Sequence, residues 1–176
     1  MTDVVKVAVE AARAAGKIQR ERAGDIQNIS EKGGLRGDVV TEVDLLCEKE
    51  IISRIKSAFP DHAILAEESG DTQGDVNNKW IIDPLDGSLN YSHGYPCYCV
   101  SIGLEHNGEQ NIGVIYNPNL DELFVAEKGR GATLNGKPIK NARGFAHIVR
   151  KISSGGVMRL QISRQGGRLF LALKKP

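Results

Sequence analysis

The stretch from Trp80 to Asn90 reads WIIDPLDGSLN and places two acidic residues directly after an apolar run. The first four residues are typical of a short buried strand, and Pro84 fixes the backbone where this strand ends at Asp83. Asp86 follows three residues after Asp83. We therefore expect the two carboxylates to turn to the same side of the chain, with the Leu85 carbonyl oxygen between them.

These three oxygen groups predict a site for a hard cation. Mg²⁺ prefers carboxylate and carbonyl oxygens, and it usually keeps coordination positions for water and for a substrate phosphate. Asp-Pro and Asp-Gly are also common turn dipeptides, so an ordinary turn explains either pair alone. The complete string after an apolar run favours the metal site.

Gly87 and Ser88 come next, and Leu89 is a candidate for the start of a helix. Backbone N–H groups that follow a glycine turn at the beginning of a helix form a site for an anion. Carboxylates for a metal beside N–H donors for a phosphate are the arrangement that metal-assisted phosphoryl transfer requires. A second apolar run, AILAE at residues 63–67, also ends in acidic residues, Glu67 and Glu68. Successive strand side chains point to opposite faces, so we expect Glu68 at the surface or in a supporting position.

Helical spacing of apolar residues predicts two helices before these strands, from Asp3 to about Glu21 and from about Glu42 to Ala58. Short strands are expected at 98–106, 111–116, 123–127, 133–134 and 137–139, with Asn-Gly turns at 107–108 and 135–136 and an Asn-Pro turn at 117–118. Two helices followed by a mostly antiparallel sheet predict a layered α+β domain. The apolar stripes are Val4, Val7, Ala8, Ala11, Ala12, Ala15 and Ile18 in the first helix and Val43, Leu46, Cys47, Ile51, Ile55 and Phe59 in the second.

The composition of the 176 residues, 40% hydrophobic and 26% charged, excludes disordered and fibrous classes. No run reaches the roughly 18 apolar residues of a membrane span, and the first residues lack the apolar core of a signal peptide. Three cysteines are too few for a disulfide framework. We therefore expect a cytoplasmic protein without membrane contact.

The net charge of +1 hides two unlike segments. Residues 1–127 hold all 22 acidic and 11 of the 23 basic residues, whereas residues 128–176 hold the other 12 basic residues and no acidic one. Beyond about residue 140 no apolar period persists and no helix caps are found. We therefore predict two parts, a metal-binding domain at 1–140 and a basic, acid-free tail of uncertain structure at 141–176.

Three ordered motifs resemble the inositol monophosphatase family of Mg²⁺-dependent, lithium-sensitive phosphatases. They are GDVVTEVD at 37–44, AEESG at 66–70 and the string at 80–90, and the resemblance covers about residues 3–140. It implies a layered α/β sandwich of the inositol monophosphatase and fructose-1,6-bisphosphatase type, truncated after the N-terminal sheet. It also implies a homodimer that hydrolyses a small phosphorylated metabolite.

The resemblance implies specific metal ligands. Glu67, Asp83 and the Leu85 carbonyl resemble the ligands of a first, tight Mg²⁺. Asp83 and Asp86 resemble ligands of a second ion that steadies the leaving oxygen, and Glu67 resembles the residue that holds a third, looser ion. The implied reaction is a direct in-line attack on phosphorus by metal-activated water, without a phosphoenzyme.

The resemblance also implies the groups that handle water and phosphate. The Ser88 hydroxyl, at a position where the family usually has Thr, would help Glu67 to orient and deprotonate the attacking water. Thr41 and Asp44 resemble supporting groups that lie near the water and the metals without binding the metals directly. The residues that resemble phosphate-binding groups are Asp86, Gly87 and Ser88.

The chain departs from the family pattern in two places. The mobile-loop lysine of the family has no clear counterpart, because Lys32 and Arg36 are both candidates and a plain solvated loop explains the segment as well. The second family signature, Trp-Asp-x-Ala-Ala, is absent, because Trp80 is the single tryptophan and no acidic residue follows Glu127. We therefore expect an incomplete second metal site and impaired hydrolysis of an inositol, sugar or nucleotide phosphate.

Three explanations remain open for residues 141–176. They are a segment that binds RNA or another polyanion, a basic extension without a role, and coding sequence altered by a frame change or by splicing. The first explanation supports an alternative function, a non-catalytic binding protein whose tail contacts RNA, RNA polymerase or a protein partner.

Overall fold

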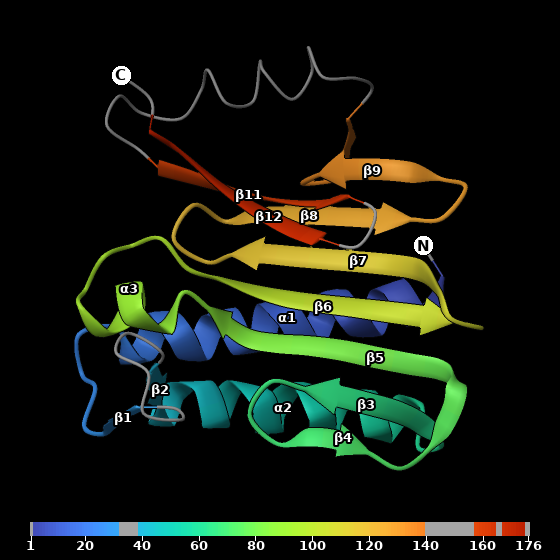
Figure 1. Cartoon of the computed structure of the whole chain (residues 1–176), viewed down its shortest axis with the longest axis horizontal. Coiled ribbons are helices and arrows are strands. Elements are labelled where there is room, and N and C mark those ends of the chain that lie inside the picture. Colours follow the sequence, from blue (N-terminus) through green and yellow to red (C-terminus); the bar gives the residue numbers. More distant parts are fainter. Residues whose placement is uncertain (1, 32–38, 140–156, 165–166, 175–176) are drawn as a thin grey trace. The chain divides into compact units, whose positions relative to one another are not determined.

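The computed structural model describes residues 2–31, 39–139, 157–164 and 167–174 (Figure 1). The chain forms two compact units, Met1–Pro138 and Ile139–Pro176. The second unit contains an antiparallel pair, β11 (Val157–Arg164) and β12 (Gly167–Lys174). Residues 158–163 alternate between apolar and polar, a pattern typical of a strand, so the expectation that no period persists beyond about residue 140 missed this signal. The assignment of 1–140 to metal binding and of 141–176 to a basic tail stays a prediction.

The two long helices form where their spacing predicts them, as α1 (Asp3–Arg22) and α2 (Glu42–Ala58). The buried stripe of α1 is turned slightly from the predicted one, because Val4, Val7 and Ile18 are only partly buried. Its buried residues are Val5, Ala8, Ala11, Ala12, Ala15, Gly16 and Gln19.

The buried face of α2 differs from the prediction at one apolar and two acidic residues. Leu46, expected on the apolar stripe, is 40% exposed, so that prediction is wrong. Asp44 and Glu48 are buried instead, at 1% and 4% exposure. Hydrophobic periodicity misses buried acidic residues because it considers only apolar side chains.

An eight-stranded sheet forms the centre of the first unit, in the order β10-β9-β8-β7-β6-β5-β3-β4. β3 and β5 run parallel, and every other neighbouring pair in this sheet is antiparallel. A separate pair, β1 (Ile29–Glu31) and β2 (Val39–Thr41), precedes α2, and the short α3 (Ser88–Ser92) follows β5. The strands of the large sheet are β3 (His62–Ala66), β4 (Gly70–Thr72), β5 (Asp75–Asp86), β6 (Cys99–His106), β7 (Glu109–Asn117), β8 (Glu122–Glu127), β9 (Gly131–Leu134) and β10 (Lys137–Pro138).

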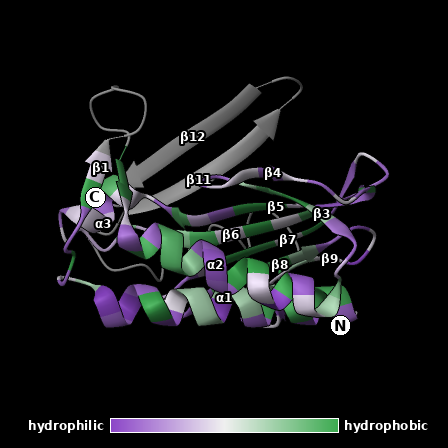
Figure 2. Ribbon diagram, turned by 90° about the horizontal axis from the view of Figure 1, so that it is seen from below, coloured by the Kyte–Doolittle hydropathy of each residue, from purple (hydrophilic) through white to green (hydrophobic). Residues whose placement is uncertain are grey.

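Both long helices lie on the same face of this sheet (Figure 2). Trp80 of β5 is fully buried there and packs against the Phe59 ring, with 5.9 Å between ring centroids. Its indole N–H donates a hydrogen bond to His62 Nδ1 at 3.0 Å. This core supports β3 and β5 from behind. No helix among the described residues is both long enough and apolar enough to cross a membrane.

A glycine of α1 allows the helix to approach the sheet closely. A Cβ added at Gly16 would lie 2.5 Å from Cε1 of the buried Tyr116 ring, so one of the two elements would have to move. We expect Gly16→Ala to lower the free energy of unfolding by up to about 2 kcal/mol, because an overpacking cost of about 1–3 kcal/mol outweighs the ~1 kcal/mol that alanine gains in helix propensity. Urea unfolding followed by circular dichroism measures this change.

Gly113→Ala is the matched control, since an added Cβ there meets no atom within 4 Å. Equal unfolding midpoints for the two variants would contradict the close approach of α1 to Tyr116.

Candidate active site

The site is built where two parallel strands end side by side. Ala66 of β3 pairs with Ile82 of β5, and the Glu67 N–H donates to the Ile82 carbonyl at 3.1 Å. The next residues along the two strands are therefore Glu67 and Asp83. The carboxyl ends of these strands lie at the same end of the sheet as α3 and β2 (Figure 1). Parallel pairing thus brings together two acidic residues that are 16 positions apart in the sequence.

β5 continues past Asp83 through an irregular segment. Its pairing with β6 is regular as far as Asp83, opposite Ser101, and resumes only at Asp86, opposite Cys99. The Leu85 N–H folds back to donate to Asp83 Oδ1 at 3.2 Å. The predicted turn is therefore a bulge within an extended strand, and both carboxylates lie at its ends.

The neighbouring carboxylates and burial raise the proton affinity of Asp83. Desolvation by burial raises the pKa of Asp83 to about 9, and the charges of Glu67 and Asp86 add to this increase. A hydrogen bond between the Asp83 and Glu67 side chains also raises the pKa of Asp83. Cys99 Sγ donates to Asp86 Oδ2 at 3.8 Å, and burial raises the pKa of the Cys99 thiol. The cluster therefore has the electrostatic environment that favours a bound positive charge.

Gly87 and Ser88 form the beginning of α3. Gly87 caps this helix with φ of 100°, in the left-handed region that favours glycine. The Ser88 Oγ lies 2.5 Å from Asp44 Oδ1 and 2.9 Å from the Leu85 carbonyl oxygen, so its single proton has two acceptors. The shorter distance is to Asp44. Ser88 therefore connects the segment after β5 to the start of α2.

Asp44 joins Ser88 to a capping box at the start of α2. The Thr41 hydroxyl donates to Asp44 Oδ2 at 2.6 Å, and the Thr41 N–H donates to the same oxygen at 2.8 Å. The Thr41 Oγ1 in turn accepts a bond from the Val43 N–H at 3.2 Å. Because Thr41 and Asp44 are both buried, this network holds the Ser88 hydroxyl in one direction.

The predicted residues thus fall into two linked groups, one of carboxylates at the strand ends and one of hydrogen-bonded groups behind them. The candidates Lys32 and Arg36 lie outside the described residues. The Glu68 N–H donates to Glu48 Oε2 at 2.8 Å, a contact that the sequence reasoning missed. Glu48 follows Asp44 by four positions, which places both on one helical face, and this spacing was the signal that could have identified it.

Gln19 is the other buried polar group that the sequence reasoning missed. Its Nε2 donates to the Pro84 carbonyl oxygen at 2.8 Å. Nothing in the local sequence of α1 connects residue 19 with residue 84, so this contact depends on the tertiary structure.

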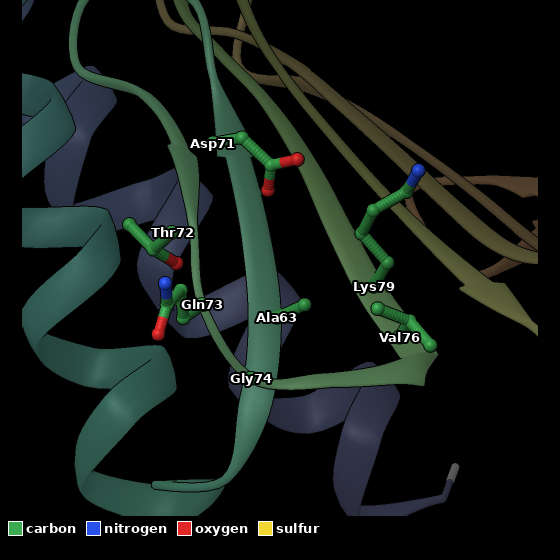
Figure 3. Close-up of a pocket in the computed structure, with 7 residues that line it drawn as sticks. All are labelled: Ala63, Asp71, Thr72, Gln73, Gly74, Val76 and Lys79. Carbon is green, nitrogen blue, oxygen red and sulfur yellow. The ribbon is translucent and has the colours of Figure 1, made fainter.

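Two negative observations limit the site. Among the described residues, no three His, Cys, Asp or Glu side chains stand close enough together to hold a metal ion without a change in their positions. A pocket of about 580 Å³ lies elsewhere, around β3, β4 and the start of β5 (Figure 3). The residues that line it are Ala63, Asp71, Thr72, Gln73, Gly74, Val76 and Lys79, and none of them is a predicted site residue.

Comparison with known proteins gives sequence relatives over most of the chain. Inositol-1-monophosphatase of Synechocystis sp. is 50% identical over 138 residues, which cover 77% of this chain and 47% of that protein. Nus factor SuhB of Xylella fastidiosa is 43% identical over 138 residues, which cover 78% of this chain and 50% of that protein. The chain therefore spans about half the length of the curated relatives it matches.

A solved structure shows the same arrangement of elements. The crystal structure of extragenic suppressor protein suhB from Bartonella henselae is 41% identical and superposes with a TM-score of 0.74. The match covers 78% of this chain and 53% of that chain. The predicted fold class, a layered α+β sandwich of the inositol monophosphatase type represented by its N-terminal part, is confirmed.

The sequence model of the inositol monophosphatase family matches residues 1–165. This range extends 25 residues beyond the boundary at 140 to which the motifs reach. The match includes the strand ends, the bulge and the capping box described above. With nearly the whole sequence covered, the chain belongs to the inositol monophosphatase family.

Proposed function

We propose that this chain supplies the N-terminal part of a Mg²⁺-dependent phosphate monoesterase that acts on an inositol phosphate or a related small sugar or nucleotide phosphate. The observation that carries the proposal is the convergence of Glu67, Asp83 and Asp86 at the end of two parallel strands, in a member of the inositol monophosphatase family. The hydrogen-bonded group of Thr41, Asp44 and Ser88 stands beside them.

The donor set fits Mg²⁺. Glu67, Asp83 and Asp86 supply carboxylate oxygens, and the Leu85 carbonyl supplies a neutral one, which are the ligand types this ion prefers. Burial and the charges of Glu67 and Asp86 raise the pKa of Asp83, and a bound cation would offset this repulsion. When bound, Mg²⁺ would lower the pKa of a water molecule and stabilise negative charge on the phosphate and the leaving oxygen.

The remaining steps belong to the side chains of this chain. The Ser88 hydroxyl donates its hydrogen bond to Asp44 Oδ1. The lone pairs of the Ser88 oxygen can therefore accept a hydrogen bond from a water molecule. Glu67 would accept a second hydrogen bond from that water and then take its proton as the oxygen attacks phosphorus. Thr41 holds Asp44 in place by donating two hydrogen bonds to it.

The phosphate would lie at the turn before α3. Gly87 is in the left-handed conformation after β5, and the N–H groups of Gly87 and Ser88 would donate to phosphate oxygens there. Asp86, proposed both as a metal ligand and as a phosphate-binding residue, directly precedes this turn. This part of the proposal rests on the family resemblance together with the conformation of Gly87.

Three finer proposals accompany this function. We infer that polypeptide 1–176 hydrolyses its substrate slowly, because no acidic residue after Glu127 supplies the Asp of the second family signature. A homodimer in the cytoplasm is the proposed state, by analogy with the family. The family match favours this proposal over the alternative of an RNA-binding or polymerase-binding protein.

A metal titration tests the proposed function directly. We expect polypeptide 1–176 to bind Mg²⁺ in isothermal titration calorimetry and to release phosphate slowly from inositol 1-phosphate. Without a bound metal ion, the carboxylates cannot lower the pKa of the attacking water. Excess EDTA should therefore abolish phosphate release, and added Mg²⁺ should restore it. Phosphate release that persists in EDTA, or no Mg²⁺ binding, would exclude the proposal, and binding of RNA with steep salt dependence would favour the alternative.

A further inference from the structure

Two buried polar side chains, one from each long helix, contact the backbone next to the proposed metal ligands. Gln19 of α1 is 0% exposed and Glu48 of α2 is 4% exposed. Neither residue is among those proposed to bind metal, water or phosphate. Burial of a polar side chain costs free energy unless it forms hydrogen bonds, so the bonds that these two residues form indicate their role.

Glu48 holds the peptide group that follows Glu67. Its Oε2 accepts from the Glu68 N–H at 2.8 Å, and the Glu67 N–H donates to the Ile82 carbonyl at 3.1 Å. The peptide groups on both sides of Glu67 are therefore fixed, one to β5 and the other to α2. Hydrogen bonds from a backbone N–H to a carboxylate are generally shorter and stronger than those between neutral groups. The contact with α2 therefore helps to set the direction in which the Glu67 side chain projects from the backbone.

Gln19 holds the peptide group that follows Asp83. The bulge leaves Pro84 outside the paired residues of β5 and β6, and Gln19 Nε2 donates to its carbonyl at 2.8 Å. Gln19 is itself held in place, because the Tyr91 hydroxyl donates to the Gln19 backbone carbonyl at 2.7 Å.

The side-chain oxygen of Gln19 shows which contact explains a glutamine at this position. Its Oε1 is buried and has no hydrogen-bond partner among the described residues. An apolar side chain at this position would avoid the free-energy cost of that buried oxygen. The bond to Pro84 is therefore the side-chain contact that accounts for a glutamine here.

We propose that Glu48 and Gln19 are positioning residues. Glu48 of α2 fixes the backbone next to Glu67, Gln19 of α1 fixes the backbone next to Asp83, and each thereby orients the neighbouring carboxylate. This inference rests on the proposed function, because the groups that are aimed are the proposed Mg²⁺ ligands. Partners that orient metal ligands typically change metal affinity by about 10-fold to 100-fold when they are removed. Neither residue touches the ion or the substrate in this proposal.

Two substitutions of Glu48 separate its hydrogen bond from its charge. Glu48→Asp keeps the charge but is one methylene too short to reach the Glu68 N–H, whereas Glu48→Gln removes the charge but keeps an acceptor at the same reach. We expect Glu48→Asp to weaken Mg²⁺ binding about 10-fold in calorimetry and Glu48→Gln to bind nearly as the parent does. Glu50→Gln controls for loss of charge on the same helix. Gln19→Met, which keeps length without a donor, should weaken binding to a similar extent.

Amide hydrogen exchange gives a second readout that needs no metal. Exchange at the Glu68 N–H should be faster in Glu48→Asp than in the parent or in Glu48→Gln. The reverse affinity order, with Glu48→Gln weak and Glu48→Asp unchanged, would overturn the positioning role in favour of a charge effect. Parent-like binding by Glu48→Asp and Gln19→Met, while Asp83→Asn fails to bind, would overturn the inference and leave the proposed function standing. A parent chain that binds no Mg²⁺ would overturn both.

Discussion

Asp83→Asn is expected to weaken Mg²⁺ binding by at least about 100-fold and to bring phosphate release from inositol 1-phosphate below detection. Asp83 lies near the carboxyl end of β5, where its charge interacts with both Glu67 and Asp86. It is also the one carboxylate that the resemblance assigns to both the first and the second metal. An amide in its place keeps the shape and the hydrogen bond from the Leu85 N–H but removes the charge that holds the ions. Calorimetry and a phosphate-release assay measure the two effects.

The same variant should not unfold the protein, and this separates a metal-binding role from a structural one. Burial and repulsion raise the pKa of Asp83 from 3.8 to about 9 in the folded chain. Stability from this group is therefore fully present below about pH 4 and is lost as the pH rises toward 9. In metal-free buffer at pH 7 we expect Asp83→Asn to unfold at the same urea concentration as the parent or at a higher one.

Asp71→Asn is the matched control, because Asp71 is an exposed carboxylate of β4 and lines the separate pocket. It should bind Mg²⁺ as the parent does. Loss of binding in both variants would contradict the assignment of Asp83 and would indicate a diffuse effect of net charge.

Trp80→Ala is expected to lower the free energy of unfolding by about 3–5 kcal/mol, the range for removal of a large buried aromatic side chain. Trp80 is fully buried between β5 and the helices, and its ring packs against Phe59. Truncation would also leave His62 Nδ1 without the indole N–H that it accepts. Urea unfolding followed by circular dichroism measures the change, since the variant lacks the tryptophan needed for fluorescence.

Two further variants show how much of this effect comes from each contact. Trp80→Phe keeps an aromatic ring and removes the N–H, so its stability should fall between those of the parent and Trp80→Ala. Val76→Ala, on the same strand but 74% exposed, should change the free energy of unfolding by no more than about 0.5 kcal/mol. An unfolding midpoint of Trp80→Ala equal to that of Val76→Ala would contradict the placement of Trp80 in the core.

The helices and most strands of the first unit could be predicted because their signals are local. α2 begins at Glu42 and ends at Ala58, as its apolar spacing and the following proline predict. β1, β2 and β4 could not be predicted in this way, because each has only three residues and forms through its partner. Strands of this length carry too few side chains for an alternating pattern to stand out.

The sequence by itself determined which residues can do chemistry here. The string at 80–90 and the pair Glu67-Glu68 identified oxygen ligands for a hard cation, and three ordered motifs identified the inositol monophosphatase family. These conclusions depend on residue types at short spacing, which a sequence displays directly. The metal ligands and the roles of Thr41, Asp44 and Ser88 remain proposals for the experiments above.

Only the tertiary structure decided how these residues meet. The parallel pairing of β3 with β5 brings Glu67 beside Asp83, and the Asp44–Ser88 bond joins residues 44 positions apart. The tertiary structure also revealed Gln19 and Glu48, whose polar side chains interrupt the apolar stripes of their helices. The physical reason is that a buried polar group needs a hydrogen-bond partner. For Gln19 and Glu48 a distant part of the chain supplies that partner, and periodicity within one helix carries no record of it.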